Sequence, residues 1–267
     1  MDARSFLAID RVDDDRFELV VAERLTTPGQ FLFGGCGLAA GVVALETASQ
    51  RPLRWATAHY LSYAPLGDTV TVRTHLLAQG GHVTQARAVM YVGEREILTV
   101  NAALGNGSIN QAEPWVQKVD VPPPLECPAR VMPERYNKSI FNSIETRVAI
   151  GRGWEQMDGT PGRPLYALWV RLPGHLDPEA ATLAIFGDFM AGGFSQPLGR
   201  NTMGRSLDNT IRIASLEPTE WVLLEMHLHA MVDGFGQGIM YLWSERGTLL
   251  ATASQSISGK FWEQPAE

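Results

Sequence analysis

The chain has 267 residues, 45% of them hydrophobic and 19% charged, which is enough to bury one large core or two smaller ones. Its 29 acidic and 22 basic residues give a formal net charge of −7, without any cluster of lysines and arginines. This balance argues against a nucleic-acid partner, although a few local arginines can still hold a small anionic ligand.

The sequence favours a cytoplasmic protein without a bound cofactor. Its two cysteines, Cys36 and Cys127, form no disulfide framework. Residues 1–15 lack the apolar core of a signal peptide, and no apolar run reaches the length of about 18 residues expected of a membrane span. The sequence has no phosphate-binding loop or dinucleotide fingerprint, and His227 and His229 lack a third metal ligand at a recognised spacing, so we expect no metal.

The first half predicts one strand, one helix and four further strands. Residues 17–25 predict the first strand. Residues 33–48 are apolar or small and almost uncharged, which predicts a helix buried on most of its faces. The glycines in this segment lower helix stability but permit close packing on a sheet. The four strands that follow are separated by glycine-containing turns and cover residues 54–63, 68–78, 84–92 and 96–104. This order indicates an α+β unit.

A proline-rich segment separates this unit from a second one of the same kind. Residues 121–133 contain too many prolines for a regular element, and residues 140–150 include a possible strand. A strand at residues 166–172 follows the segment. Asp177 and Pro178 then predict the start of a helix that runs through Met190. Four more strands are predicted at residues 205–213, 220–232, 236–244 and 248–257.

The second half therefore repeats the first. Residues 93–102 (GEREILTVNA) align with residues 244–253 (SERGTLLATA), which lie 151 positions later. We predict an N-terminal repeat at residues 1–112, a linker at 113–164 and a C-terminal repeat at 165–267. A duplicated fold often needs one working site, so polar residues that break the repeat are candidates. At this offset Thr57 aligns with Asp208, and Leu104 aligns with Gln255.

Several motifs resemble the acyl-CoA thioesterase II family, and the similarity covers about residues 15–262. It implies a tandem, or double, hot-dog fold in which an antiparallel sheet wraps a long central helix in each repeat. It also implies a hydrolase of fatty acid metabolism that cleaves fatty acyl-CoA to free acid and CoA by direct attack of a positioned water. The motifs are Leu32-Phe33-Gly34-Gly35, Ser206-Leu207-Asp208-Asn209, Glu220 to Leu224 and Gly247 to Gln255.

The resemblance also suggests the catalytic residues. In that family an Asp, a hydroxyl residue and a Gln in the second repeat position the water. The resemblance places Asp208 and Gln255 at the Asp and Gln positions, whereas His229 falls where the family has Thr or Ser. The resemblance therefore implies Asp208, Gln255 and His229 as the catalytic set. On a regular strand, His227 and Glu225 would share a face with His229.

The candidate substrate-binding residues begin the first predicted helix, where backbone N–H groups can approach a thioester oxygen. They are Gly34, Gly35, Cys36 and Gly37. The simpler interpretations are close packing for the glycines and a buried apolar residue for Cys36. Asp208 can equally end a strand at a turn, and Gln255 can be a satisfied core residue.

Two rival functions and an oligomeric state follow from the same pattern. Because His229 replaces the family hydroxyl, the alternative is a non-catalytic acyl-CoA or lipid-binding hot-dog protein. A hydratase would need an Asp and His pair on the helix side of one repeat, and the first helix lacks one. Exposed sheet edges favour association, so we expect a homo-oligomer.

Overall fold

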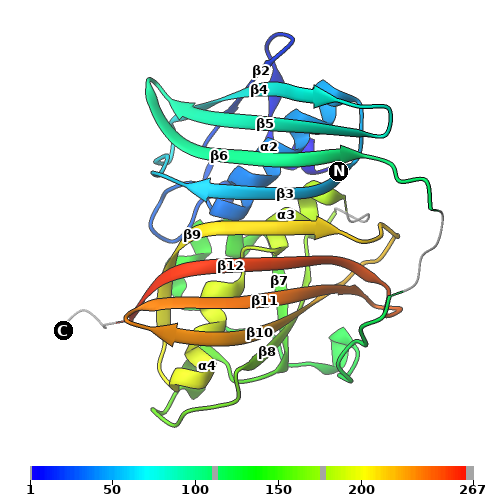
Figure 1. Ribbon diagram of the computed structural model, residues 1–267. Coiled ribbons are helices and arrows are strands. Elements are labelled where there is room, and N and C mark those ends of the chain that lie inside the picture. Colours follow the sequence, from blue (N-terminus) through cyan, green and yellow to red (C-terminus); the bar gives the residue numbers. More distant parts are fainter. Residues whose placement is uncertain (1, 110–113, 175–178, 263–267) are drawn as a thin grey trace.

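A single antiparallel sheet of 12 strands runs through the part of the chain that the structure describes and curves around the central helices (Figure 1). The computed structural model describes residues 2–109, 114–174 and 179–262. The strand order across the sheet is β1-β2-β4-β5-β6-β3-β9-β12-β11-β10-β8-β7. No helix in the described ranges is long and apolar enough to cross a membrane.

The first repeat contains the predicted helix and all five predicted strands. Two short elements, α1 (Ala3–Leu7) and β1 (Asp10–Arg11), precede them. The predicted elements are β2 (Arg16–Val20), α2 (Gly34–Ser49), β3 (Leu53–Tyr60), β4 (Thr69–Gln79), β5 (Val83–Val92) and β6 (Arg95–Gly105). A 3-10 turn, η1 (Glu23–Leu25), leads into α2.

The second repeat contains its predicted strands, but its helix is broken. The strands are β8 (Leu165–Arg171), β9 (Thr202–Ile213), β10 (Val222–Val232), β11 (Phe235–Ser244) and β12 (Leu249–Phe261). The helical pieces are α3 (Ala180–Phe186), η6 (Met190–Phe194) and α4 (Ser195–Leu198). The segment predicted as the linker holds β7 (Glu145–Ile150) and four 3-10 turns: η2 (Pro124–Glu126), η3 (Glu134–Lys138), η4 (Ile140–Asn142) and η5 (Trp154–Gln156).

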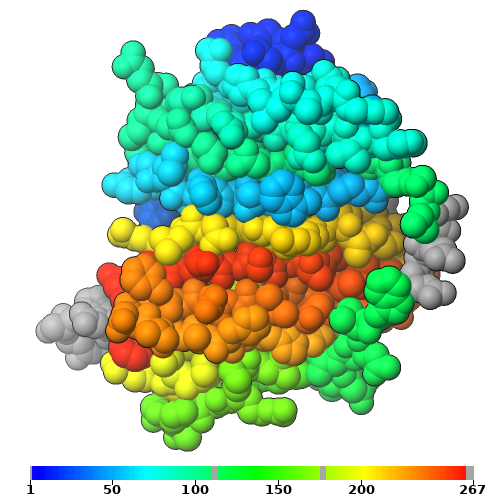
Figure 2. All heavy atoms as spheres, in the orientation of Figure 1, coloured from blue at the N-terminus to red at the C-terminus, as the bar shows by residue number. Residues whose placement is uncertain are grey.

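The sheet topology confirms that the chain repeats itself. In the first repeat the strands are ordered β2-β4-β5-β6-β3, and in the second the equivalent strands are ordered β8-β10-β11-β12-β9. The two halves join edge to edge where β3 pairs with β9, and the hydroxyls of Thr57 and Thr210 lie 2.7 Å apart at this junction. Both repeats therefore contribute to one continuous sheet, and in Figure 2 the blue band of β3 lies beside the yellow band of β9.

The expectation of a long central helix in each repeat holds for the first repeat but not for the second. α2 has 16 residues, whereas α3 has 7 and ends at Phe186. The predicted helix ends at Phe186 with Gly187 as its cap, and the chain then turns so that Asp188 accepts a hydrogen bond from the Gly35 N–H. The predicted N-cap at Asp177 and Pro178 lies outside the described residues.

Glycines let α2 approach its neighbours closely. A Cβ atom at Gly41 would lie 2.9 Å from Cγ2 of Val100 on β6. A Cβ atom at Gly35 would lie 2.6 Å from the carbonyl oxygen of Ile185 on α3. The glycines of this apolar segment therefore serve packing against both the sheet and the other helix.

The linker covers the outer face of the second repeat. In Figure 2 the green linker rests against the orange strands. Beneath it lies a small second core, and the indole N–H of Trp169 donates to the carbonyl of Pro122 at 2.9 Å. The buried members of this core are Cys127, Ala167, Trp169, Trp221, Leu223 and Trp243.

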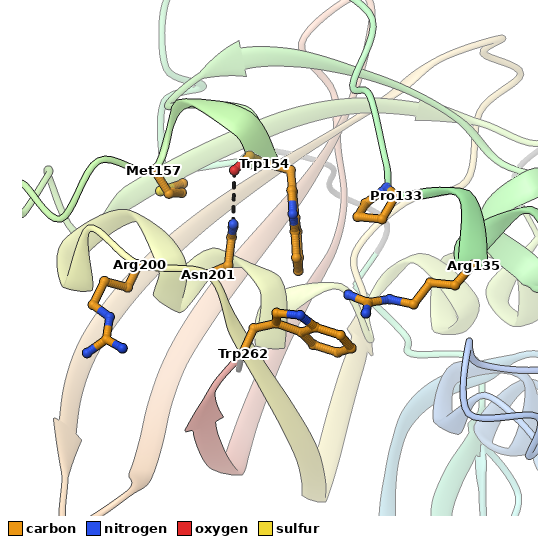
Figure 3. Close-up of a pocket in the computed structure, with 7 residues that line it drawn as sticks. All are labelled: Pro133, Arg135, Trp154, Met157, Arg200, Asn201 and Trp262. Atoms are coloured by element: carbon orange, nitrogen blue, oxygen red, sulfur yellow. Dashed lines mark hydrogen bonds between the residues drawn. The ribbon is translucent and has the colours of Figure 1, made fainter. Parts of the chain in front are cut away.

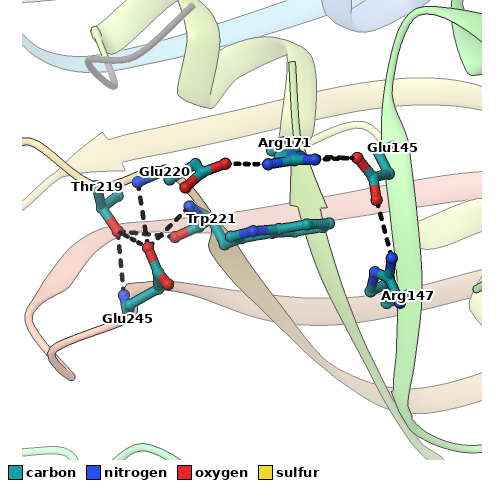
Figure 4. A network of polar contacts seen from close by, with 7 residues as sticks. All are labelled: Glu145, Arg147, Arg171, Thr219, Glu220, Trp221 and Glu245. Atoms are coloured by element: carbon teal, nitrogen blue, oxygen red, sulfur yellow. Dashed lines mark hydrogen bonds and ion pairs between the residues drawn. The ribbon is translucent and has the colours of Figure 1, made fainter. Parts of the chain in front are cut away.

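Ion pairs join β7 to the rest of the second repeat (Figure 4). Glu145 accepts hydrogen bonds from Arg171 at 2.7 Å and from Arg147 at 3.2 Å, and Arg171 also pairs with Glu220. The Arg171 guanidinium lies 4.6 Å from the centre of the Trp221 ring. Burial acts to raise the pKa of Glu145, but the hydrogen bonds from these arginines lower it overall.

Glu225 is a buried carboxylate that connects the linker to this sheet. Its side chain accepts hydrogen bonds from the Trp243 indole at 2.8 Å and from the Val119 backbone N–H at 3.2 Å, and it contacts the His227 ring at 2.7 Å. The prediction that Glu225 and His227 share a face is confirmed by this contact.

We expect Glu225→Ala to lower the free energy of unfolding by about 2–4 kcal/mol, because it leaves the buried Trp243 indole N–H and the partly buried Val119 N–H without an acceptor. Urea unfolding followed by circular dichroism measures this loss. The matched control is Glu94→Ala in an exposed turn, which should change stability by less than about 0.5 kcal/mol. Equal effects of the two substitutions would contradict this role for Glu225.

Candidate active site

The Asp188 carboxylate lies buried where the two repeats meet. Asp188 follows the end of α3 in the second repeat and is 6% exposed. Its Oδ2 accepts a hydrogen bond of 2.7 Å from the backbone N–H of Gly35, in the first turn of α2 in the first repeat. Phe33, the N-cap residue of α2, supplies no side-chain acceptor, so Asp188 fills that role. The positive end of the α2 dipole also favours the negative charge.

The second carboxylate oxygen of Asp188 is held by side chains of its own repeat. Its Oδ1 accepts from the hydroxyl of Ser206 at 3.0 Å, from the amide of Gln255, and more weakly from the amide of Asn209 at 3.5 Å. The Gln255 amide also donates to the Ser206 hydroxyl at 2.7 Å. A carboxylate, a hydroxyl and an amide therefore form one connected group.

A β-bulge explains how Ser206 and Asn209 both face Asp188. Along β9 and β12, Asn209 pairs with Gln255, Asp208 pairs with Ser256, and Ser206 pairs with Ile257. Leu207 is the extra residue on β9. Residues three apart would point to opposite faces of a regular strand, but the extra residue returns Ser206 to the inner face.

Burial raises the pKa of the Asp188 carboxyl from 3.8 to about 6, although hydrogen bonds from Ser206, Gly35, Gln255 and Asn209 act in the opposite direction. At neutral pH this group is therefore ionised, but it is a stronger base than an exposed carboxylate. Desolvation, and then the nearby Asp188 charge, raise the pKa of the Cys36 thiol well above 9.0. Cys36 is thus a protonated, buried thiol, as the simpler interpretation of the sequence predicts.

Three buried polar atoms around this group have no hydrogen-bond partner among the described residues. They are Oε1 of Gln255, Oδ1 of Asn209 and the hydroxyl oxygen of Tyr60. Tyr60 lies on β3, the strand that pairs with β9, which carries Asn209. Burial, and then the charge of Asp188, raise the pKa of the Tyr60 hydroxyl well above its usual value of 10.0. Buried polar atoms are rarely left unpaired, so this cluster is suited to a polar molecule such as water.

The structure brings one of the three predicted catalytic residues to this site. Gln255 contacts Asp188. Asp208 and His229, which we expected to lie beside Gln255, lie elsewhere in the structure. Asp208 faces the other side of the sheet, where it accepts from the Ser256 backbone N–H at 2.8 Å. His229 is exposed at a bulge of β10, and β11 separates its strand from that of Gln255.

The four predicted substrate-binding residues divide into two groups. Gly34 and Gly35 border Asp188, because a Cβ atom at Gly34 would lie 2.7 Å from Oδ2 of Asp188. Cys36 is buried close enough for the Asp188 charge to affect its pKa. Gly37 faces the sheet instead, since a Cβ atom there would lie 2.8 Å from Leu98 on β6.

Sequence reasoning missed Asp188, Ser206, Asn209 and Tyr60. The available signal for Asp188 was a single charged residue within the apolar run that follows Ala180. Ser206 lies in one of the motifs that carry the family resemblance, but the resemblance assigned the hydroxyl position to His229. Because the bulge at Leu207 breaks the alternation of β9, strand alternation could not show that Ser206 and Asn209 share a face.

Comparison with known proteins identifies the family. The acyl-CoA thioesterase C-terminal domain matches residues 124–258, and the acyl-CoA thioesterase N-terminal domain matches residues 21–105. The chain belongs to the acyl-CoA thioesterase family. It is accordingly a thioester hydrolase, and the tandem hot-dog arrangement fits the sheet described above.

Solved structures with the same architecture include an inferred thioesterase from Novosphingobium aromaticivorans. It is 28% identical, with a TM-score of 0.84, and the match covers 96% of this chain and 99% of that one. A hot-dog protein of unknown function from Alicyclobacillus acidocaldarius is 18% identical, with a TM-score of 0.84 and coverage of 99% and 98%. An acyl-CoA thioesterase II from Mycobacterium marinum is 16% identical, with a TM-score of 0.74 and coverage of 98% and 99%. No curated protein matches the sequence.

The raised pKa of Asp188 makes stability depend on pH in a defined direction. Above about pH 6 the carboxyl is ionised in both states, and the folded state bears the cost of burying the charge. As pH falls to about 4, the folded protein takes up the proton first and gains stability. Relative to Asp188→Asn, wild type should gain roughly 2 kcal/mol between pH 7 and pH 4. Urea unfolding of both proteins across this range measures the gain. Parallel stability curves would contradict the raised pKa.

Proposed function

We propose that this thioesterase hydrolyses fatty acyl-CoA to free acid and CoA, using a water held by Asp188, Ser206 and Gln255. The observation that supports the proposal most strongly is the group of unpaired acceptors around the Asp188 carboxylate. A water beside Gln255 can donate one hydrogen to the unpaired Oε1 and the other to Asp188. Ser206 and Gln255 keep the carboxylate in position, because both donate to the same oxygen.

In this mechanism the water oxygen forms a bond to the thioester carbon while Asp188 accepts a water proton. The carbonyl oxygen becomes an oxyanion, which the backbone N–H of Gly34 can stabilise. The N–H of Gly35 donates to Asp188, and those of Cys36 and Gly37 donate to the Phe33 carbonyl. The intermediate then loses its C–S bond, and the CoA thiolate takes the proton from Asp188. A carboxyl whose pKa is about 6 suits both proton transfers, since it lies close to neutral pH.

The position of Ser206 removes the reason for favouring a non-catalytic binding protein. That alternative depended on a histidine at the position of the family hydroxyl. In the structure a hydroxyl, that of Ser206, lies 3.0 Å from Asp188, and His229 lies elsewhere on the sheet. Asp188, Ser206 and Gln255 thus supply the Asp, hydroxyl and Gln that the family resemblance implies.

The expectations from the sequence about location, metabolic role, repeat boundaries and oligomeric state stay part of this proposal. The protein would act in the cytoplasm in fatty acid metabolism, with repeats at residues 1–112 and 165–267 joined by a linker at 113–164. The outermost strands of the described sheet are β1 and β7. Such edges can pair with another copy, which supports a homo-oligomer.

We expect Asp188→Asn to lower kcat at least about 100-fold, because it removes the proton acceptor, and Ser206→Ala and Gln255→Ala to lower it at least about tenfold each. Release of free thiol from acyl-CoA substrates of several chain lengths measures the rates. Wild type should release thiol from at least one chain length, and no release from any of them at high enzyme concentration would refute the proposed reaction.

Two substitutions serve as matched controls. Asp208→Asn changes another carboxylate on the same strand as Ser206, and His229→Ala removes an exposed imidazole. Both variants should keep kcat within about threefold of wild type. If they lose activity while Asp188→Asn does not, the catalytic set is the one implied by the resemblance rather than the one around Asp188.

A further inference from the structure

A surface pocket of about 350 Å³ lies where the linker meets the ends of β9 and β12 (Figure 3). It adjoins a second hollow of about 370 Å³ that shares Pro133, Trp154, Met157 and Asn201 with it. The Asn201 amide donates to the carbonyl of Trp154 at 3.0 Å, which links the two walls. The residues around the first pocket are Pro133, Arg135, Trp154, Met157, Arg200, Asn201 and Trp262.

Arg135 is the distinctive residue of this pocket. Its guanidinium lies over the Trp262 ring, 3.0 Å from the ring centre, and also contacts the rings of Trp154 and Tyr136. Its Nε and Nη2 atoms are buried and have no hydrogen-bond acceptor among the described residues. Buried guanidinium N–H groups normally find an acceptor, so an anionic ligand would complete this site.

The pocket provides charge and an apolar wall together. Arg200 is a second, exposed guanidinium on its rim, where it lies 3.9 Å from the centre of the Phe261 ring. Glu155, a carboxylate, borders the adjoining hollow. The two arginines match phosphate groups, which guanidinium groups bind well, and the indoles of Trp154 and Trp262 offer surfaces for a planar base.

Aromatic side chains connect this pocket to the catalytic group. The ring centre of Trp154 lies 6.1 Å from that of Tyr136, which lies 5.3 Å from that of Phe141. The Phe141 ring contacts those of Phe33 and Phe189 at 5.8 Å and 5.5 Å. Phe33 immediately precedes Gly34, and Phe189 immediately follows Asp188. These ring contacts place the surface pocket and the catalytic group in the same region of the protein.

We propose that this pocket binds the phosphorylated nucleotide end of the acyl-CoA substrate, with Arg135 and Arg200 contacting its phosphates. This inference rests on the proposed function and identifies the part of the protein that distinguishes CoA thioesters from simpler ones. The acyl end does not fit here, because a fatty chain would leave the buried N–H groups of Arg135 unpaired.

The first experiment compares two substrates that share an acyl group. One is the acyl-CoA, and the other is the acyl thioester of N-acetylcysteamine, which has no nucleotide or phosphate. Arg135→Ala should raise KM for the acyl-CoA about tenfold or more, with kcat nearly unchanged, and should leave kcat/KM for the short thioester unchanged. Arg200→Ala should act in the same direction, and Arg135→Lys should recover part of the loss. Arg87→Ala, an exposed arginine on β5, is the matched control.

A second experiment measures binding without turnover. Adenosine 3′,5′-bisphosphate is titrated into wild type and into Arg135→Ala by calorimetry, and it should bind wild type about tenfold more tightly. It should also inhibit acyl-CoA hydrolysis competitively. Non-competitive inhibition would instead indicate a separate nucleotide site that regulates the enzyme, and would overturn the proposal.

The outcomes separate this inference from the proposed function. If wild type hydrolyses neither substrate, the proposed function fails, and the titration alone decides whether the pocket binds a nucleotide. If wild type hydrolyses both substrates and Arg135→Ala slows both equally, Arg135 has a structural role and the nucleotide site is refuted. Absence of bisphosphate binding to wild type would refute it as well.

Discussion

The buried carboxylate of Asp188 joins the two halves of this protein. One of its oxygens accepts from the Gly35 N–H at the start of the first-repeat helix, and the other accepts from Ser206 and Gln255 in the second-repeat sheet. A charge in this apolar setting is costly unless donors surround it. The glycines of α2 permit the close approach, and the break after α3 allows Asp188 to turn toward them.

The duplication divides the work between the repeats. The first repeat has an unbroken helix, and the N–H of Gly35 near its N-terminus donates to Asp188. The second repeat has a shorter helix, after which the Asp188 carboxylate follows. The predicted linker also contributes, because Val119 bonds to Glu225 on the second-repeat strands and Arg135 and Trp154 line the surface pocket. Chemistry and substrate recognition would thus come from different segments around one continuous sheet.

Periodicity and turn signals predicted the sheet well, because each strand of both repeats has a hydrophobic pattern of its own. Strand alternation could not identify Ser206, because a bulge adds one residue to β9, and the resemblance gave the hydroxyl position to His229 instead, at a bulge of β10. Sequence patterns also missed Asp188, since a helix pattern does not show that Gly187 ends the helix. Gln255 was identified through the family resemblance and the break in the repeat, and the structure pairs it with Asn209.

The most direct test of the Asp188 junction is the NMR titration of the Gly35 amide, which donates to this carboxylate. The account predicts that its proton and nitrogen shifts change with a midpoint near pH 6, and that the change disappears in Asp188→Asn. A midpoint near the ordinary aspartate value of 3.8, or no change between pH 3 and pH 8, would contradict a buried carboxylate shared by the two repeats.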